Sequence, residues 1–369
     1  MAIVRAAERT ASSGLVFVQC AAGAAMTDHA EAATHTLAQV RRAEGSDFRT
    51  IDIHAHCAVA EAMVLMGQKI SAIGGDSLPL ALAGDQAATR LAAMDAQQID
   101  MAVLSINPFW YAADPDLSRQ IIDLQNDALA DFVARHPDRF AALASVALQH
   151  PELAATQLEH AIKKLGLRGA LIGGSVQGKE LSEPLFHPFW AKAEALGVLI
   201  FIHPQGMGEA AARLRGSGGL GNVVGNPLET TIALSHLIFE GTLDRFPDLR
   251  ICAAHGGGYL PSYAARSDAG IKTFPQTYTV KLKKNPSAYL RDLYYDSLVF
   301  TAEGLRHLIA EVGAERVMLG SDYPYPWTAR SVAHVLETPG LSEGERAAIL
   351  GATAAQLLGL SASSPRSTN

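Results

Sequence analysis

From Thr50 onward, short apolar or β-branched runs alternate with longer amphipathic stretches, and this alternation limits the fold more than any other feature. Strands that alternate with helices pair in parallel through crossover connections. Eight such units favour an α/β fold of the closed (β/α)₈ type, a TIM barrel. An open doubly wound sheet is the alternative, but no GxGxxG motif follows the first strand to support a dinucleotide site.

The boundaries of these elements follow from the apolar runs and from proline positions. Pro151, Pro188 and Pro227 suit the first turn of a helix, where the missing N–H costs no hydrogen bond. The expected helices are 87–96, 116–135, 151–165, 188–196, 227–246 and 302–312. The expected strands are 50–53, 101–105, 140–146, 169–172, 198–203, 250–255, 293–296 and 317–320.

We expect one barrel domain over residues 49–362, with an N-terminal extension over 1–48 and a short tail over 363–369. No internal repeat or long linker divides the chain. Insertions are expected at Cys57–Asp85 and Gly206–Gly225, and a helical segment is expected after Arg330.

The N-terminal extension holds little information about the fold. Its apolar stretch Gly14–Ala25 follows Arg5 and Arg9 and faintly resembles a secretory signal. Glu8 and Gln19 interrupt that pattern. We therefore interpret this region as an extension or a misplaced start, with Met26 as an alternative beginning.

Composition excludes several classes of protein. The 369 residues are 49% hydrophobic and 18% charged, which suits a large dry core and not a disordered chain. The net charge of −7 argues against a nucleic-acid binder. The sequence has no run of about 18 or more apolar residues, so no membrane-spanning helix is predicted. The 3 scattered cysteines do not form a disulfide framework and favour a reducing, cytoplasmic compartment.

Residues that bind metals or move protons follow several of the expected strands. His54 and His56 end the first strand, and period-two alternation turns both toward the same side. His203 and His255 end the fifth and sixth strands, and the eighth leads to Asp322. A lone histidine is most often a packed or surface residue, and the HxH pair alone is a weak signal. Five such residues on four strands, where barrels hold their working groups, indicate a metal centre.

Four segments carry a resemblance to a known family. They are DIHAH (52–56), FIHP (201–204), HGGGYLPSYAAR (255–266) and LGSDYPYPW (319–327). In this order they resemble the metal-dependent amidohydrolase superfamily, and most closely its branch that contains aminocarboxymuconate-semialdehyde decarboxylase and related aromatic-acid decarboxylases. The resemblance extends over about Ile51–Leu360. It implies a (β/α)₈ barrel with one divalent ion, Zn²⁺ or in some relatives Mn²⁺.

The resemblance also implies a role for each residue of the set. His54, His56, His203 and Asp322 match the metal ligands, and His255 matches a catalytic acid/base. Such a ligand set leaves room for a water, whose pKa the ion would lower. An unligated histidine passes protons near neutral pH. Asp322 either only binds the ion or also moves a proton. The alternative to a functional role is that Asp322 forms an Asx turn before Pro324.

An arginine sets the expectation for the substrate and the subunit arrangement. Arg266 matches a family arginine that binds a substrate carboxylate from a partner subunit, which implies a homodimer. The alternative interpretation is that Arg266 is an ordinary solvated arginine on a helix. The family's second carboxylate-binding arginine has no counterpart within Ser77–Ala83, and Arg90 matches a different family position. This departure favours a more apolar or monoacidic substrate.

Aromatic and polar side chains after several strands are candidates for substrate contacts. Phe109 and Trp110 follow the second strand, Gln205 follows the fifth and Trp327 follows the eighth. Flat side chains there suit an aromatic or dienoic ligand. The alternative is that they cover the barrel top or contact another subunit. Gly256–Gly258 let substrate or backbone approach closely, or form a flexible turn.

Three functions fit these observations. The first is a metal-dependent decarboxylase of a small aromatic or unsaturated carboxylic acid, with His255 and Asp322 as catalytic groups. The second is hydrolysis of an amide, ester, lactone or activated C–C bond by the same residues. The third is a non-catalytic barrel, which would not require His255 in addition to the metal ligands. One barrel supports many reactions, so fold and ligands do not choose between the first two. The expected partner is a small carboxylic acid, with no nucleic acid and no membrane.

Overall fold

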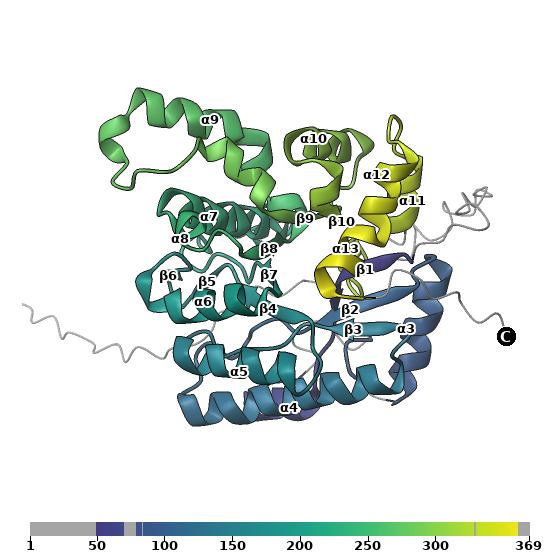
Figure 1. Ribbon diagram of the computed structural model, residues 1–369. Helices are drawn as coiled ribbons and strands as arrows, with labels where there is room; N and C mark the ends of the chain where they lie inside the picture. Colours follow the sequence, from purple (N-terminus) through teal and green to yellow (C-terminus); the bar gives the residue numbers. More distant parts are fainter. Residues whose placement is uncertain (1–48, 70–78, 83, 328–329, 361–369) are drawn as a thin grey trace, which may run out of the picture.

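The computed structural model describes residues 49–69, 79–82, 84–327 and 330–360 (Figure 1). The predicted N-terminal extension, residues 1–48, and the predicted tail, residues 363–369, lie outside the described residues. None of the described helices is long and apolar enough to cross a membrane.

Parallel strands form the centre of the molecule in two hydrogen-bonded sheets. One sheet has the order β1-β2-β3 and the other the order β10-β9-β8-β7-β4. The described strands of these sheets are β1 (Ile51–His56), β2 (Met101–Ser105), β3 (Phe140–Ala142), β4 (Gly169–Gly173), β7 (Leu199–His203), β8 (Arg250–Ala253), β9 (Tyr294–Asp296) and β10 (Val317–Met318).

Backbone hydrogen bonds join the two sheets at both seams and close the ring. Between β3 and β4, the N–H of Ala144 donates to the carbonyl of Gly169 at 2.8 Å. Between β10 and β1, the N–H of Ile53 donates to the carbonyl of Leu319 at 2.9 Å. The order β1-β2-β3-β4-β7-β8-β9-β10-β1 is that of a closed (β/α)₈ barrel, and the predicted fold class is confirmed.

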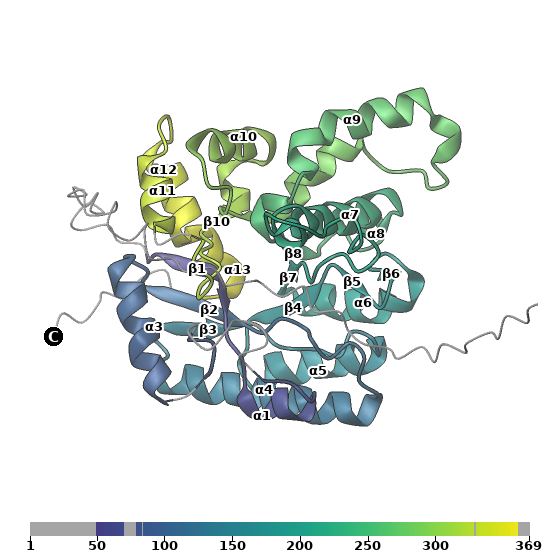
Figure 2. The same ribbon diagram turned by 180° about the vertical axis from the view of Figure 1, so that it is seen from behind.

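Helices surround this ring on the outside, as the two opposite views show (Figures 1 and 2). Several begin as expected, with proline in the first turn, and the side chain of Asp114 caps the longest by accepting from two backbone N–H groups. The described helices are α1 (Ala60–Leu65), α3 (Gly84–Ala96), α4 (Pro115–Arg135), α5 (Pro151–Lys163), α6 (His187–Leu196), α7 (Asn226–Phe239), α8 (Thr242–Arg245), α9 (Leu260–Thr273), α10 (Ala302–Val312), α11 (Ser331–Glu337), α12 (Glu343–Ala347) and α13 (Thr353–Leu358).

Two helical regions differ from the sequence prediction. The single helix predicted over 227–246 is divided into α7 and α8, because Gly241 between them adopts a left-handed conformation with φ of 74°. Helix α9 was not among the predicted helices. Its sequence has little apolar periodicity, and only Leu260, Pro261 and Ala264 along it are buried. A short hairpin, β5 (Ser175–Val176) and β6 (Lys179–Glu180), follows β4.

The interior of the barrel is filled with apolar side chains. Ile51 and Ile53 of β1, Leu171 of β4 and Phe201 of β7 belong to one buried cluster, against which residues of α13 pack. A filled interior leaves no channel through the ring. Polar chemistry is therefore confined to the end of the barrel where the strands finish.

Candidate metal centre

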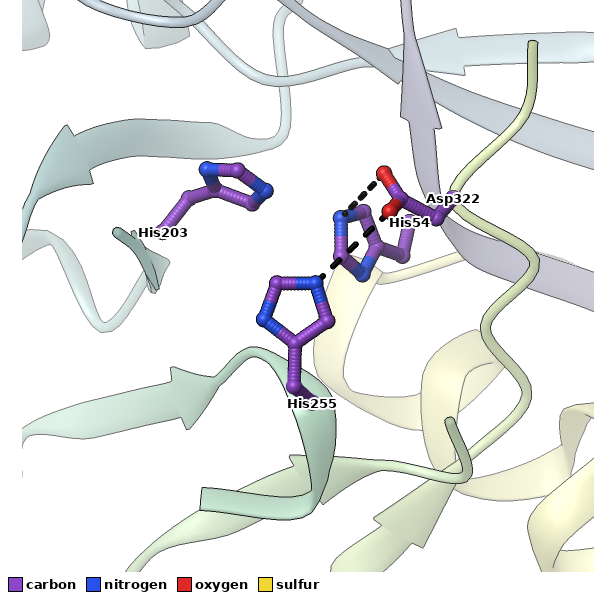
Figure 3. A group of neighbouring side chains, drawn as sticks. All are labelled: His54, His203, His255 and Asp322. Atoms are coloured by element: carbon purple, nitrogen blue, oxygen red, sulfur yellow. Dashed lines mark ion pairs between the residues drawn. The ribbon is translucent and has the colours of Figure 1, made fainter. Parts of the chain in front are cut away.

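The predicted metal ligands meet at the carboxyl ends of their strands. The Nε2 atoms of His54 and His56, both on β1, lie 3.0 Å apart. They lie 3.2 Å and 3.0 Å, respectively, from Oδ1 of Asp322, which follows β10. The His203 ring, at the end of β7, has its centroid 5.0 Å from that of His54 and 4.6 Å from that of His56. Figure 3 shows His54, His203 and Asp322 turned toward a common centre.

Unpartnered nitrogens mark this centre as a place for a cation. Both ring nitrogens of His203 are buried and find no hydrogen-bond partner among the described residues. Buried polar atoms are almost always satisfied in native proteins, so this imidazole is available to a partner that the described residues do not supply. Three imidazoles and one carboxylate form a donor set that suits a divalent transition metal, and the residues present fit such an ion.

His255 lies beside this set but on a different side of Asp322. Its Nε2 is 3.7 Å from Oδ2 of Asp322 (Figure 3), whereas Nε2 of His54 and Nε2 of His56 contact Oδ1. Ligand atoms of His54, His203, His255 and Asp322 also lie within 4.8 Å of one another, so a grouping with His255 in place of His56 is geometrically open. We favour His56 as the ligand because its Nε2 is closer to Asp322, and its ring centroid is 4.9 Å from that of His54, against 5.2 Å for His255. His255 is also more exposed than the other members of the set.

Electrostatics at the centre favour a positive charge. Burial opposes charging of His54, but the carboxylates of Asp322 and Asp296 outweigh it and raise its pKa to about 10. Burial lowers the pKa of His56 and of His203, which keeps both rings neutral. Burial raises the pKa of Asp322, but the surrounding histidines reverse the effect and hold it well below its usual range. The carboxylates of Asp322 and Asp296 therefore favour a positive charge at this centre.

The backbone is strained at two of the functional positions. His255 and Asp322 have φ values of 55° and 60°, a left-handed region that residues with a side chain seldom occupy. Hydrogen bonds hold both in place. The N–H of His255 donates to Asp296 at 2.9 Å, and the N–H of Asp322 donates to the carbonyl of His54 at 2.8 Å. Such strain collects at functional sites, where the surrounding structure fixes it.

Asp296, the last residue of β9, organises the centre and had no predicted role. Its buried carboxylate accepts from Nδ1 of His54 at 2.7 Å and from the backbone N–H groups of His255 and Gly256, each at 2.9 Å. One side chain thus orients a predicted metal ligand and the predicted acid/base beside it. The only sequence signal was an aspartate at the end of an expected strand, and no motif singled it out.

Replacement of Asp296 by asparagine is expected to weaken metal binding about 10–100-fold, because a ligating histidine depends on a carboxylate at its other nitrogen. Competition with a chromogenic chelator measures this affinity. Asp123→Asn on the exposed face of α4 is the matched control and should not change it. Equal affinity in both variants would show that Asp296 does not support His54.

The glycines after His255 serve the protein's own packing. A Cβ atom at Gly258, where φ is 66°, would lie 2.1 Å from the carbonyl oxygen of Pro227. At Gly256 a Cβ would lie 2.4 Å from Cγ1 of Val299. The backbone of this turn therefore packs tightly against α7 and the segment after β9. Its close contacts are with protein atoms, which accounts for the glycines without a substrate.

Gly258→Ala is expected to destabilise the fold by about 2–5 kcal/mol, the sum of left-handed strain and a steric clash. Gly219→Ala is a matched control, because Gly219 has a φ of 60° but no atom within 4 Å of its Cβ position. Its cost should be only about 1 kcal/mol. Urea denaturation of both variants measures the difference, and equal costs would contradict the clash.

The predicted substrate residues lie in different environments. Trp110 is fully buried and its indole N–H donates to the carbonyl of Val146 at 2.9 Å, which argues for a packing role. Phe109 is half-buried. Gln205 is exposed, and its side-chain amide donates to the carbonyl of Pro108 at 2.6 Å. Trp327 is exposed after β10, and Arg266 is exposed on α9.

Three further buried side chains support the centre through hydrogen bonds to the backbone or to neighbouring segments. Arg90 on α3 donates to the carbonyl of His56 at 2.7 Å, so its guanidinium holds the end of β1. Glu229 on α7 accepts from the backbone N–H groups of Gln205 and Gly206, and fixes the turn after His203. Asp52 accepts from the hydroxyl of Ser321 at 2.5 Å and joins β1 to the segment before Asp322.

Comparisons with known proteins agree with this geometry. An amidohydrolase family model matches residues 51–360. The chain is 34% identical to 2-amino-3-carboxymuconate-6-semialdehyde decarboxylase of Dictyostelium discoideum, over 73% of this chain and 76% of that protein. Its fold matches crystal structures of two further decarboxylases. The 5-carboxyvanillate decarboxylase of Sphingomonas paucimobilis has a TM-score of 0.75 and 27% identity, with 85% and 99% of the chains covered.

The second structure is a dihydroxybenzoic acid decarboxylase of Polaromonas with bound manganese and the inhibitor 2-nitroresorcinol. It has a TM-score of 0.73 and 25% identity, with 85% of this chain and 97% of that chain covered. The match to the family model, the barrel and the similarity to these decarboxylases lead to one conclusion: the chain belongs to the amidohydrolase family, in the branch that contains aminocarboxymuconate-semialdehyde decarboxylase.

Proposed function

We propose that this protein decarboxylates a small aromatic or unsaturated carboxylic acid at the centre formed by His54, His56, His203 and Asp322. The observation that carries the proposal is the place of His255. Its Nε2 lies 3.7 Å from Oδ2 of Asp322, whereas Nε2 of His54 and of His56 lie 3.2 Å and 3.0 Å from Oδ1, so His255 borders the proposed metal position without being needed as a ligand. A group there can deliver a proton to a substrate held at the centre.

In the proposed reaction, the protein's own residues supply one proton to the substrate. His255 donates a proton to the ring or chain carbon that bears the carboxylate. The carbon–carboxylate bond then breaks, its electron pair restores the unsaturated system, and CO₂ leaves. The net change replaces CO₂ with a proton. Asp322 faces Nε2 of His255 through Oδ2 and stabilises the imidazolium that donates the proton.

The proposed cofactor is one divalent ion, with Zn²⁺ favoured by the imidazole-rich donor set and Mn²⁺ as the alternative. When bound, the ion supplies positive charge that stabilises negative charge on substrate oxygens. The Polaromonas relative contains manganese. Metal analysis of purified protein, followed by reconstitution of the chelated protein with each ion, distinguishes the two.

A panel of substrates tests the proposed reaction. Hydroxybenzoates, carboxyvanillate and muconate-type acids should release CO₂ in amounts equal to the decarboxylated product. The related decarboxylases favour this class. Hydrolysis of an amide, ester or lactone by the metal-loaded protein, with no CO₂ from any acid, would replace the proposal by its hydrolase alternative.

We further propose that the active enzyme is a homodimer in which Arg266 binds a carboxylate in the partner's site. Arg266 is exposed on α9, and no described residue forms an ion pair with it. Tyr263 on the same helix is also exposed, and so is Val223 in the insertion before α7. Exposed apolar side chains on α9 and just before α7, together with an exposed cation on α9, suit a subunit interface.

Mixing two inactive variants tests this arrangement. Arg266→Ala and His255→Asn should each be nearly inactive alone. A mixed dimer regains one intact site, so refolding equal amounts together should restore about a quarter of wild-type activity if subunits exchange randomly. Lys272→Ala, another exposed cation on α9, is the matched control and should remain active. No recovery on mixing would place Arg266 in its own subunit or outside the site.

The compartment is also part of the proposal. Cys57 and Cys252 are buried and free, and burial raises the pKa of both thiols. Unbridged, unreactive cysteines suit a reducing compartment. We therefore propose that the enzyme works in the cytoplasm, and fractionation of the source cells tests it.

A further inference from the structure

A cavity lies between the segments that follow β9 and β10 and helix α11. Its volume is about 320 Å³, at the lower end of the range for small-molecule sites. We call it the α11 crevice; it is lined by Ser297, Leu298, Phe300, Gly320, Trp327, Arg330, Ser331, His334 and Glu337. None of the metal ligands lines it.

Gly320 separates the α11 crevice from the metal centre. A Cβ atom at Gly320 would meet Cβ of Asp296 at 2.9 Å and Cβ of His54 at 3.3 Å, so its inner side is packed. The N–H of Gly320 donates to the hydroxyl of Ser297 at 3.3 Å. A molecule in the crevice would therefore lie next to the metal centre but would not share its ligands.

Two aromatic rings stand at the rim of the α11 crevice. Phe300 is 56% exposed and Trp327 is 42% exposed, and their ring centroids are 6.1 Å apart. Phe300 has a φ of 62°, a strained conformation for a bulky side chain. Strain held in a folded protein is a pointer to function, and here its effect is to present an aromatic ring to solvent beside a cavity.

Helix α11 supplies the polar wall of the crevice. Ser331 and His334 are three residues apart and so share a face. The hydroxyl of Ser331, a residue only 2% exposed, and Nε2 of His334 are buried and have no hydrogen-bond partner within the part of the chain that the structure describes. Burial lowers the pKa of His334, so its ring is neutral near pH 7. Arg330 and Glu337 form an ion pair at 2.5 Å, which leaves the wall without net charge.

We propose that the α11 crevice is a second small-molecule site, which binds an uncharged single-ring phenol. The ring would pack against Phe300 and Trp327, and its hydroxyl would face the polar wall that Ser331 and His334 form. A hydroxyl can donate to one and accept from the other. A carboxylate fits less well, because Glu337 lines the cavity and already neutralises Arg330.

Binding of resorcinol, with benzoate as the charged comparator, tests the site. Trp110 and Trp190 are buried, so quenching of solvent-exposed tryptophan emission reports on Trp327. Resorcinol should quench this emission in the metal-loaded protein and equally in His203→Ala, which lacks a complete metal centre. Benzoate should bind at least tenfold more weakly. Loss of the resorcinol response in His203→Ala would place the ligand at the metal and overturn the proposal, as would equal binding of benzoate.

Two variants remove the crevice's own contacts, with affinity measured by calorimetry. Phe300→Gly should raise the resorcinol Kd at least tenfold while Tm stays the same or rises, because glycine adopts the left-handed conformation freely. Ser331→Ala should raise the Kd at least threefold. Unchanged affinity in both would overturn the proposal. None of these results depends on whether the protein decarboxylates its substrate.

Discussion

His255→Asn is expected to lower the rate of decarboxylation about 10²–10⁴-fold while the metal content stays at the wild-type level. The proposed proton donor is lost, but the ligands His54, His56, His203 and Asp322 remain. Asparagine suits this test because it tolerates the left-handed conformation of His255, where φ is 55°. Turnover of the best acid of the substrate panel, with metal analysis of the same sample, measures both quantities.

His307→Asn on the exposed face of α10 is the matched control and should retain full activity. Two results would contradict the role given to His255. Full activity in His255→Asn would show that the proton comes from elsewhere. Loss of the metal would instead support the alternative ligand grouping, in which His255 replaces His56.

The sequence is sufficient to predict the barrel and the convergence of the candidate metal ligands. Period-two alternation places His54 and His56 on one side of a strand, and parallel strands bring their carboxyl ends together. These rules need no tertiary contacts. They therefore predict the meeting of His203 and Asp322 with the first strand, although these residues are far apart in the chain. The resemblance to a family then separates the proposed ligands from His255, the proposed proton donor.

The residues that support the centre could not be predicted in this way. Asp296, Arg90 and Glu229 act through hydrogen bonds to residues 242, 34 and 24 positions away, respectively. No local pattern encodes such pairs. Arg90 shows the difficulty: an arginine near the site suggests a substrate contact, yet its guanidinium is buried against backbone carbonyls. A buried polar side chain is given its role by its partners, and the partners are known only from the fold.

Asp296 connects the proposed metal ligand His54 with the proposed proton donor His255. Its carboxylate binds Nδ1 of the ligand His54 and also the backbone of His255. A shift of this one side chain would move a metal ligand and the proton donor together. The tight packing of Gly256 and Gly258 keeps the His255 turn fixed against such a shift. Rigidity at this turn therefore contributes to the alignment of donor and metal.

His203→Ala is expected to abolish decarboxylation and to remove the metal from the purified protein. Both ring nitrogens of His203 lack partners among the described residues, so the substitution breaks no hydrogen bond there and the chain should still fold. Loss of one ligand from four leaves too few donors for tight binding at this centre. Elemental analysis and turnover measure the result, and chelation of the wild-type protein should reproduce it.

The stability of the same proteins provides an independent test. A metal present at 1,000 times its Kd stabilises the folded state by about 4 kcal/mol, and chelation should remove this contribution. Chelator should therefore lower the Tm of the wild-type protein and of His307→Asn, but not that of His203→Ala. The effect of chelation should also be greatest near neutral pH, because protons compete for the histidine ligands in acid. A Tm that responds to chelator equally in His203→Ala would place the metal at some other site.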